Sequence, residues 1–190
     1  MSESRREPLL SGHPISRRGF LVRSVWVTAG LGAGALACGR GDARYAALLP
    51  AGETPSQIPA CEYAVLRAVV DRLVPEATDR PGAIALGVPA RIDRELAYHG
   101  PRLRDDVIAA LRLVEWWPLV TQGSRFTALE PAAQDAVLEA MAASRLAARR
   151  TAMQGLKLLT VFFTYTQEPT WAAIGYDGPW VPRNRPAALG

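Results

Sequence analysis

Prolines cut the chain after its first third into short segments, and within these segments apolar residues recur every three or four positions. In the first segment Leu66, Val69, Val70 and Leu73 follow the i, i+3, i+4, i+7 spacing of a buried helical face. Pro75 ends this segment, because proline cannot continue a helix. Neither a convincing two-residue alternation nor an internal repeat is found. The pattern therefore predicts an all-α fold.

The predicted fold is a small, irregular bundle of about five to six helices. The first helix begins near residue 60, the second near 88, the third near 102 and the fourth near 131, and a fifth covers about 144–164, with a short final helix at 169–174. After the first helix, the side chains predicted to face the core are Ile92, Leu96, Leu103, Val107, Ala110, Leu111, Val114, Val137, Leu138, Met141, Leu146, Met153, Leu156, Leu159 and Phe163.

The first 37 residues have the order of an export signal. A charged beginning is followed by an uncharged run at 24–39, which is shorter than the roughly 20 apolar residues that a spanning helix needs. An arginine pair with phenylalanine two positions later resembles the twin-arginine signal of proteins that are exported already folded. The residues of this motif are Ser16, Arg17, Arg18, Phe20 and Leu21. We expect the protein at the periplasmic side of the cytoplasmic membrane.

Two interpretations of Cys38 remain open. The stretch before Cys38 resembles a lipobox, in which Cys38 would become the lipidated first residue of a membrane-anchored protein, although Ala35 stands where leucine is usual. Alternatively, Ala35 and Ala37 form an A-x-A site for ordinary signal cleavage.

The body is predicted to begin at residue 60. Residues 38–59 contain Pro50, Pro55 and Pro59 among small and polar residues, and this composition predicts a flexible linker. Residues 60–182 form the helical domain and residues 183–190 a C-terminal tail.

Charge and motifs exclude several function classes. After residue 37 the net charge is +1, too small for the clustered positive surface that nucleic-acid binding needs. The sequence has no string typical of zinc ligands, haem attachment or a serine-hydrolase elbow. The one histidine after the signal, His99, is predicted to be a capping or surface residue. We expect no catalytic residue, cofactor or metal in this chain, and an enzyme using His99 or Cys61 ranks last.

Cys61 and the C-terminal aromatic residues each have a structural and a functional interpretation. Cys61 is either a small buried residue at a helix start or one half of a disulfide to another subunit. Trp171, Tyr176 and Trp180 either seal the end of the bundle or anchor a partner protein, since tryptophan and tyrosine are enriched at interfaces.

Six stretches, in order and with sensible spacing, resemble the gluconate 2-dehydrogenase subunit 3 family. They lie at 66–75, 81–83, 88–93, 126–135, 162–163 and 171–179. One departure is the short segment from Thr164 to Thr170, where the family often has a longer, glycine-rich loop. The resemblance implies a small subunit with a twin-arginine signal that accompanies a large flavoprotein dehydrogenase of the glucose–methanol–choline type, often with a cytochrome c subunit. It places FAD and the catalytic residues in the large subunit.

The sequence thus predicts a non-catalytic accessory subunit that binds, stabilises and co-exports a flavin-dependent dehydrogenase through the twin-arginine translocase. The alternative is a free-standing, lipid-anchored periplasmic helical protein with a binding or structural role and no redox partner.

Overall fold

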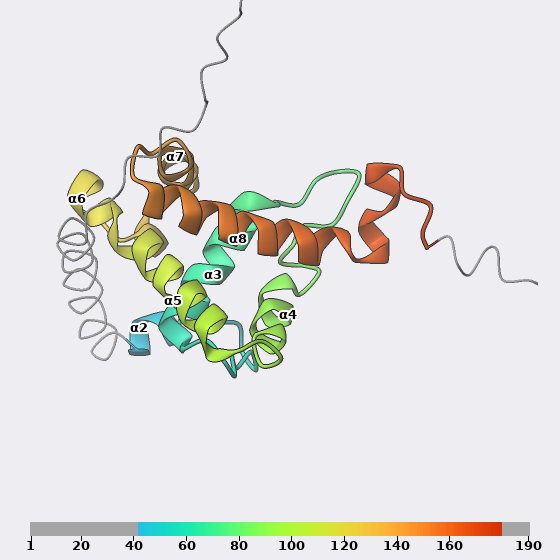
Figure 1. Ribbon diagram of the computed structural model, residues 1–190, viewed down its shortest axis with the longest axis horizontal. Helices are drawn as coiled ribbons and strands as arrows, with labels where there is room; N and C mark the ends of the chain where they lie inside the picture. Colours follow the sequence, from blue (N-terminus) through green and yellow to red (C-terminus); the bar gives the residue numbers. More distant parts are fainter. Residues whose placement is uncertain (1–41, 180–190) are drawn as a thin grey trace, which may run out of the picture.

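The computed structural model describes residues 42–179, and these residues form a helical bundle without a strand (Figure 1). The predicted all-α fold is confirmed. The helices are α2 (Asp42–Ala46), α3 (Ala60–Leu73), α4 (Val88–Glu95), α5 (Pro101–Trp116), α6 (Pro118–Gln122), α7 (Pro131–Ala142) and α8 (Ala147–Tyr165), with 3-10 turns η1 (Phe126–Ala128), η2 (Glu168–Thr170) and η3 (Ala172–Ile174).

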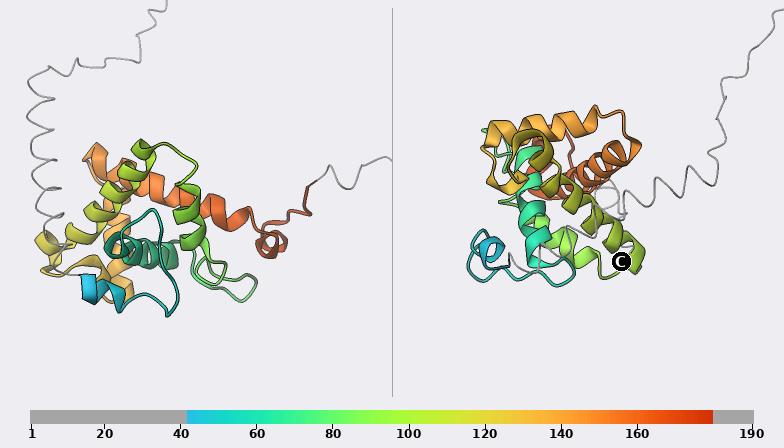
Figure 2. Two further views of the ribbon diagram at one scale, coloured as in Figure 1. Left: turned by 90° about the horizontal axis from the view of Figure 1, so that it is seen from below. Right: turned by 90° about the vertical axis from the view of Figure 1, so that its left-hand side faces the viewer.

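Helix α3 occupies the centre of the bundle. It packs against α2, α4, α5, α7, α8 and η1, so its buried residues extend beyond the single predicted stripe. The longest helix, α8, crosses α3 and also packs against α4, α5 and α7 (Figures 1 and 2). The core therefore lies where α3, α5 and α8 meet.

Prolines set where several helices begin. Pro101 and Pro131 occupy the first helical position of α5 and α7, where a missing N–H group costs no helical hydrogen bond. Pro118 ends α5 as predicted, and it also begins the short helix α6, which the sequence analysis did not predict.

Two leucines predicted to face the core lie on the surface instead. Leu103 is in the first turn of α5, and Leu146 directly precedes α8 with 56% of its surface exposed. Both positions fit the helical apolar spacing, but each lies at the N-terminal end of its helix. The other residues predicted to face the core are buried or half-buried.

Residues 44–58 differ from the predicted flexible linker, because the bundle holds them in place. The side chains of Tyr45 and Ile58 are buried, Tyr45 against Cys61 and Ala64 and Ile58 in the main core. Between them, the backbone of residues 56–58 donates hydrogen bonds to the buried carboxylate of Asp93 on α4. The prolines prevent a long helix here, as expected, but they do not prevent packing.

The connection between α3 and α4 needs a glycine at one point. A side-chain carbon at Gly82 would lie 2.7 Å from the backbone nitrogen of Glu76. This close approach lets the N–H group of Ala83 bind the carbonyl of Val74 at 2.9 Å, which returns the chain to the bundle.

Candidate partner interface

The C-terminal end of α8 is held by side chains that bind its last carbonyl groups. The side-chain amide of Gln167 donates to the carbonyl of Phe163 at 2.8 Å. The buried Thr170 hydroxyl lies 2.7 Å from the Gln167 carbonyl and 3.2 Å from that of Thr164. These contacts satisfy acceptors that a helix end otherwise leaves unpaired. The segment after α8 is therefore a structured continuation of the helix.

Two of the aromatic residues predicted as partner anchors meet in this continuation. Trp171 and Tyr176 stack edge to face with ring centroids 5.1 Å apart. Gly175 adopts a positive φ of 66°, and the N–H group of Tyr176 binds the Trp171 carbonyl at 2.9 Å. The positive φ lets the chain turn back on itself, which brings the two rings together.

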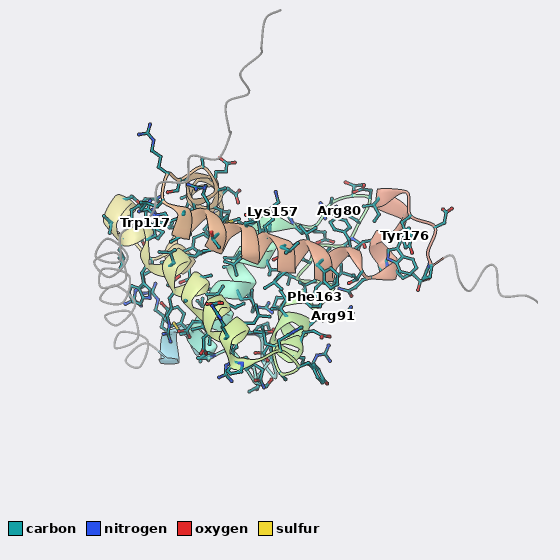
Figure 3. All side chains as sticks on the ribbon, viewed as in Figure 1. Arg80, Arg91, Trp117, Lys157, Phe163 and Tyr176 are labelled. Carbon is teal, nitrogen blue, oxygen red and sulfur yellow. The ribbon has the colours of Figure 1, made fainter. Side chains whose placement is uncertain are left out.

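This aromatic pair lies on a projection with apolar surface. Figures 1 and 2 show the C-terminal turns projecting from the end of α8, and Figure 3 shows Tyr176 on the projection. Tyr176 is 46% exposed and the neighbouring Ile174 is 51% exposed, whereas Trp171 is half-buried. An aromatic side chain with a buried body and an accessible edge suits a protein interface.

Further exposed apolar side chains lie on α8 itself. Leu158 and Phe162 are 67% and 57% exposed, and their spacing of four places them on the same helix face. This exposed apolar face was not predicted from the sequence. A signal for it exists, since adjacent Phe162 and Phe163 cannot both face the core. In the structure Phe163 is buried beside Arg91 of α4 (Figure 3).

The remaining predicted export and anchor residues lie outside the described part of the chain. They are Ser16, Arg17, Arg18, Phe20, Leu21, Ala35, Ala37, Cys38 and Trp180. Within residues 42–179, no helix combines the length and hydropathy that crossing a membrane requires.

Cys61 lies in the interior, where the predicted disulfide to another subunit has no access. It packs in a small cluster with Tyr45 and Ala64, with Trp116 at the edge. Because Tyr45 covers this corner, the structure favours the interpretation of Cys61 as a small buried residue. A bond to another subunit would need the segment around Tyr45 to leave the bundle.

The buried carboxylate of Glu115 joins three elements, one of them through Tyr45 of the cluster around Cys61. Glu115 of α5 accepts hydrogen bonds from the Tyr45 hydroxyl at 2.7 Å and from the Thr127 hydroxyl and N–H group at 2.8 and 3.0 Å. Burial raises the pKa of Glu115, and the hydrogen bonds from Tyr45 and Thr127 partly oppose this effect. Arg125 stacks over Trp116 and donates to the Tyr45 hydroxyl. Both carboxylate oxygens of Glu115 accept hydrogen bonds from Tyr45 or Thr127, so this cluster is a joint between α2, α5 and η1.

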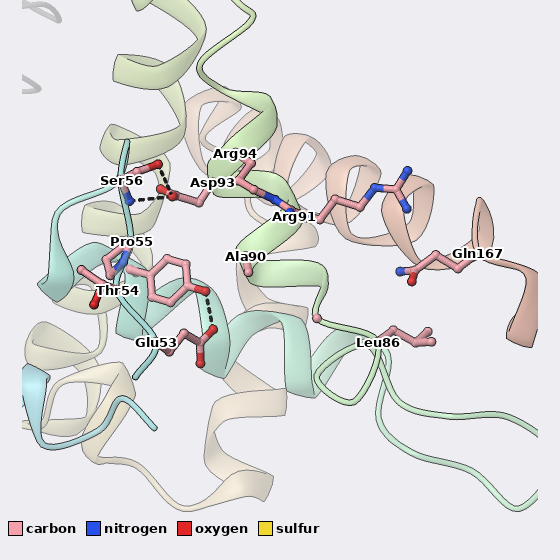
Figure 4. Close-up of a pocket in the computed structure, with 12 residues that line it drawn as sticks. Glu53, Thr54, Pro55, Ser56, Leu86, Ala90, Arg91, Asp93, Arg94 and Gln167 are labelled. Carbon is pink, nitrogen blue, oxygen red and sulfur yellow. Dashed lines mark hydrogen bonds between the residues drawn. The ribbon is translucent and has the colours of Figure 1, made fainter. Parts of the chain in front are cut away.

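A surface hollow of about 510 Å³ lies between residues 53–56 and α4 (Figure 4). Its two carboxylates have structural partners. Glu53 binds the Tyr63 hydroxyl and the Arg67 guanidinium, and Asp93 accepts four hydrogen bonds from Ser56, Gln57 and Ile58. Both carboxylates therefore hold the N-terminal segment on the bundle. We call the contacts of Asp93 with residues 56–58 the clamp.

Other sequence candidates for chemistry are dispersed. His99 is exposed in the connection between α4 and α5. Residues 42–179 contain no cluster of three or more histidine, cysteine, aspartate or glutamate side chains that could hold a metal ion.

A family model described as gluconate 2-dehydrogenase subunit 3 matches residues 60–178, which is more than half of the chain. The chain belongs to the gluconate 2-dehydrogenase subunit 3 family. Searches among curated proteins and among solved structures gave no match. The subunit 3 match begins at the first residue of α3 and includes Trp171 and Tyr176. The segment with Tyr45 precedes the match, although it packs on the matched bundle.

Proposed function

We propose that this chain is a non-catalytic accessory subunit that binds, stabilises and co-exports a flavin-dependent dehydrogenase of the glucose–methanol–choline type. The observation that carries the proposal is the match of residues 60–178 to subunit 3 of gluconate 2-dehydrogenase, because that name denotes a subunit of a dehydrogenase complex. FAD would be held by the large partner, and a cytochrome c subunit would complete some complexes.

Two further features support this role. The rigid aromatic pair Trp171–Tyr176 and the exposed side chains of α8 offer an apolar surface for a partner. The motif around Arg17 and Arg18 fits the export of folded cargo, and a flavoprotein must bind its flavin before it crosses the membrane. A partner without a signal could then be exported bound to this chain.

The test is a gentle affinity purification of the C-terminally tagged chain from the envelope fraction. We expect one large partner in stoichiometric amount by mass spectrometry, with the visible absorption bands of a flavin. A colourless, solitary chain would contradict the proposal and favour the free-standing, lipid-anchored protein. Mass spectrometry of the N-terminus would show in the same sample whether Cys38 carries lipid.

Co-export is tested by replacing Arg17 and Arg18 together with lysine. We expect the flavoprotein to remain in the cytoplasm, because the translocase reads the arginine pair. Arg5 and Arg6 offer a matched control, since the same double replacement changes an arginine pair that is not followed by phenylalanine. Export of the flavoprotein that survives replacement of Arg17 and Arg18 would refute co-export but not complex formation.

A further inference from the structure

The face of α8 opposite the core has the residue spacing of a helix–helix contact. Thr151, Gly155, Leu158, Phe162 and Tyr165 follow each other at intervals of four, three, four and three residues. The first four are exposed and Tyr165 is half-buried. This stripe is about 21 Å long at 1.5 Å per residue, and we call it the α8 seam.

The composition of the α8 seam is unusual for a surface that faces water. The outward face of a helix on a globular protein is normally charged or polar. The α8 seam contains no charged residue, and its two largest exposed side chains are Leu158 and Phe162. The spacing and apolar character are those of the seam through which two helices pack.

Gly155 in the middle of the α8 seam has no role within the described bundle. A side-chain carbon added there would have no heavy atom within 4 Å. Its backbone is ordinary helix, and glycine is among the least favourable residues in a helix interior. The physical use of such a residue is to let another backbone approach closely. A lipid surface would gain nothing from this gap, whereas a helix would pack a side chain into it.

Charge indicates which kind of helix would fit. Helix α8 carries the exposed Arg150 and Lys157 and no acidic residue, while its third basic residue, Arg149, lies over the ring of Trp117. A second copy of α8 would bring like charges together, and like charges disfavour an interface. Along one flank, a groove of about 650 Å³ separates Arg150 and Lys157 from Asp135 and Glu139 of α7. Among the described residues, no ion pair crosses this groove.

From these observations we infer that the α8 seam is the docking surface for an amphipathic helix of the flavoprotein, with an apolar stripe and acidic flanking residues. The inference rests on the proposed function, because it takes the flavoprotein as the partner. Leu158 and Phe162 would enter the partner's apolar stripe, and Gly155 would receive one of its side chains. Lys157, which Figure 3 shows at the edge of α8, would face an acidic residue of the partner.

The experiment uses the complex that co-purifies with the full chain. A photo-reactive amino acid is placed at residue 158 and, as the matched control, at residue 120, because Val120 on α6 is 79% exposed and is not part of the seam. We expect position 158 to cross-link to a flavoprotein peptide with apolar residues at helical spacing and acidic neighbours. Position 120 should give no such product.

Affinity is measured with Gly155→Leu, Leu158→Glu and the control Val120→Glu. The first two should weaken binding of the purified flavoprotein about tenfold or more, and the control should change it less than about twofold. Gly155→Leu also separates binding from folding. Because leucine favours a helix and meets open space at this position, the thermal midpoint of the chain alone should not fall.

The outcomes distinguish this inference from the proposed function. Absence of the flavoprotein from the wild-type sample would overturn both. Undiminished binding by Gly155→Leu and Leu158→Glu would overturn the α8 seam alone. A cross-link from position 158 to a second copy of the chain, or to lipid only, would also overturn it.

Discussion

Asp93 is the residue on which the N-terminal segment depends most. Its carboxylate accepts hydrogen bonds from the Ser56 N–H and hydroxyl groups at 2.7 and 2.9 Å, and from the N–H groups of Gln57 and Ile58 at 2.9 and 2.7 Å. The side chain of Asp93 is only 3% exposed, so its carboxylate depends on these donors for hydrogen bonds.

Replacement of Asp93 by asparagine should lower the free energy of unfolding by about 2–3 kcal/mol, because an amide has only one acceptor and adds donors that face other donors. Chemical denaturation followed by circular dichroism measures this. Asp106→Asn is the matched control, since Asp106 is exposed on α5 and should change the free energy by less than about 0.5 kcal/mol. Equal stability of both variants would show that the clamp is dispensable.

Glu115 should make stability depend on pH. Burial raises its pKa in the folded state, so the fold holds this proton more tightly than the unfolded chain does. As pH rises from below the ordinary carboxyl pKa through the raised value, the contribution of Glu115 to the free energy of unfolding must therefore decrease.

The glutamine in Glu115→Gln cannot titrate. The free energy of unfolding of the wild type should therefore exceed that of the variant most at low pH, and the difference should shrink as the pH increases. Urea unfolding of both proteins from about pH 4 to about pH 8 measures the difference. Glu76→Gln, at an exposed position, serves as the control for replacing a glutamate by glutamine. A difference that grows with pH would mean that the hydrogen bonds outweigh the effect of burial.

Among the elements, the turns after α8 should loosen when Thr170 loses its hydroxyl. Thr170→Val keeps the shape of the buried side chain but removes the contacts to the Thr164 and Gln167 carbonyls. The amides of residues 171–176 should exchange with solvent about fivefold faster, which corresponds to one ordinary hydrogen bond of ~1 kcal/mol. Thr166→Val removes only a long 3.5 Å contact to the Phe163 carbonyl at an exposed position in the same turn, so it should change exchange much less.

The elements themselves were largely predictable, because their signals are local. Pro101 and Pro131 indicate where α5 and α7 begin, and the buried apolar residues of α7 match the predicted set, with Gln134 buried in addition. Local spacing failed for Leu103 and Leu146, since periodicity does not show where a helix leaves its neighbours. The exposed face of α8 was not predicted. This helix has two apolar stripes, and the sequence alone does not show which of them the neighbouring helices cover.

For the whole molecule, the structure makes residues 42–59 part of the folded unit. A chain that begins at residue 60, where the family match begins, should lose about 4 kcal/mol or more of unfolding free energy relative to a chain that begins at residue 42. It would lose the buried side chains of Tyr45 and Ile58 and leave the Asp93 carboxylate without its donors. Thermal unfolding of the two purified chains tests this, and equal midpoints would restore the linker interpretation.

The sequence offered no local signal for this packing. Tyr45 is 70 residues from Glu115, and Ser56 is 37 residues from Asp93, so each pair forms only when distant segments meet. The three prolines at 50, 55 and 59 indicate correctly that no long helix forms between Tyr45 and α3. They do not indicate that backbone N–H groups will find a buried acceptor.

The joint between Tyr45 and Glu115 also has a mechanical consequence. Tension applied to the N-terminal end of the described chain would pass first through Tyr45, into α5 by its hydroxyl and into α3 by its packing on Cys61 and Ala64. It would then pass through the contacts of Glu53 with Tyr63 and Arg67 of α3 and through residues 56–58 into α4. These attachments lie on three helices, so the load is shared among them. A chain pulled from this end would yield at α2 first, while the central helix and the face of α8 kept their shape.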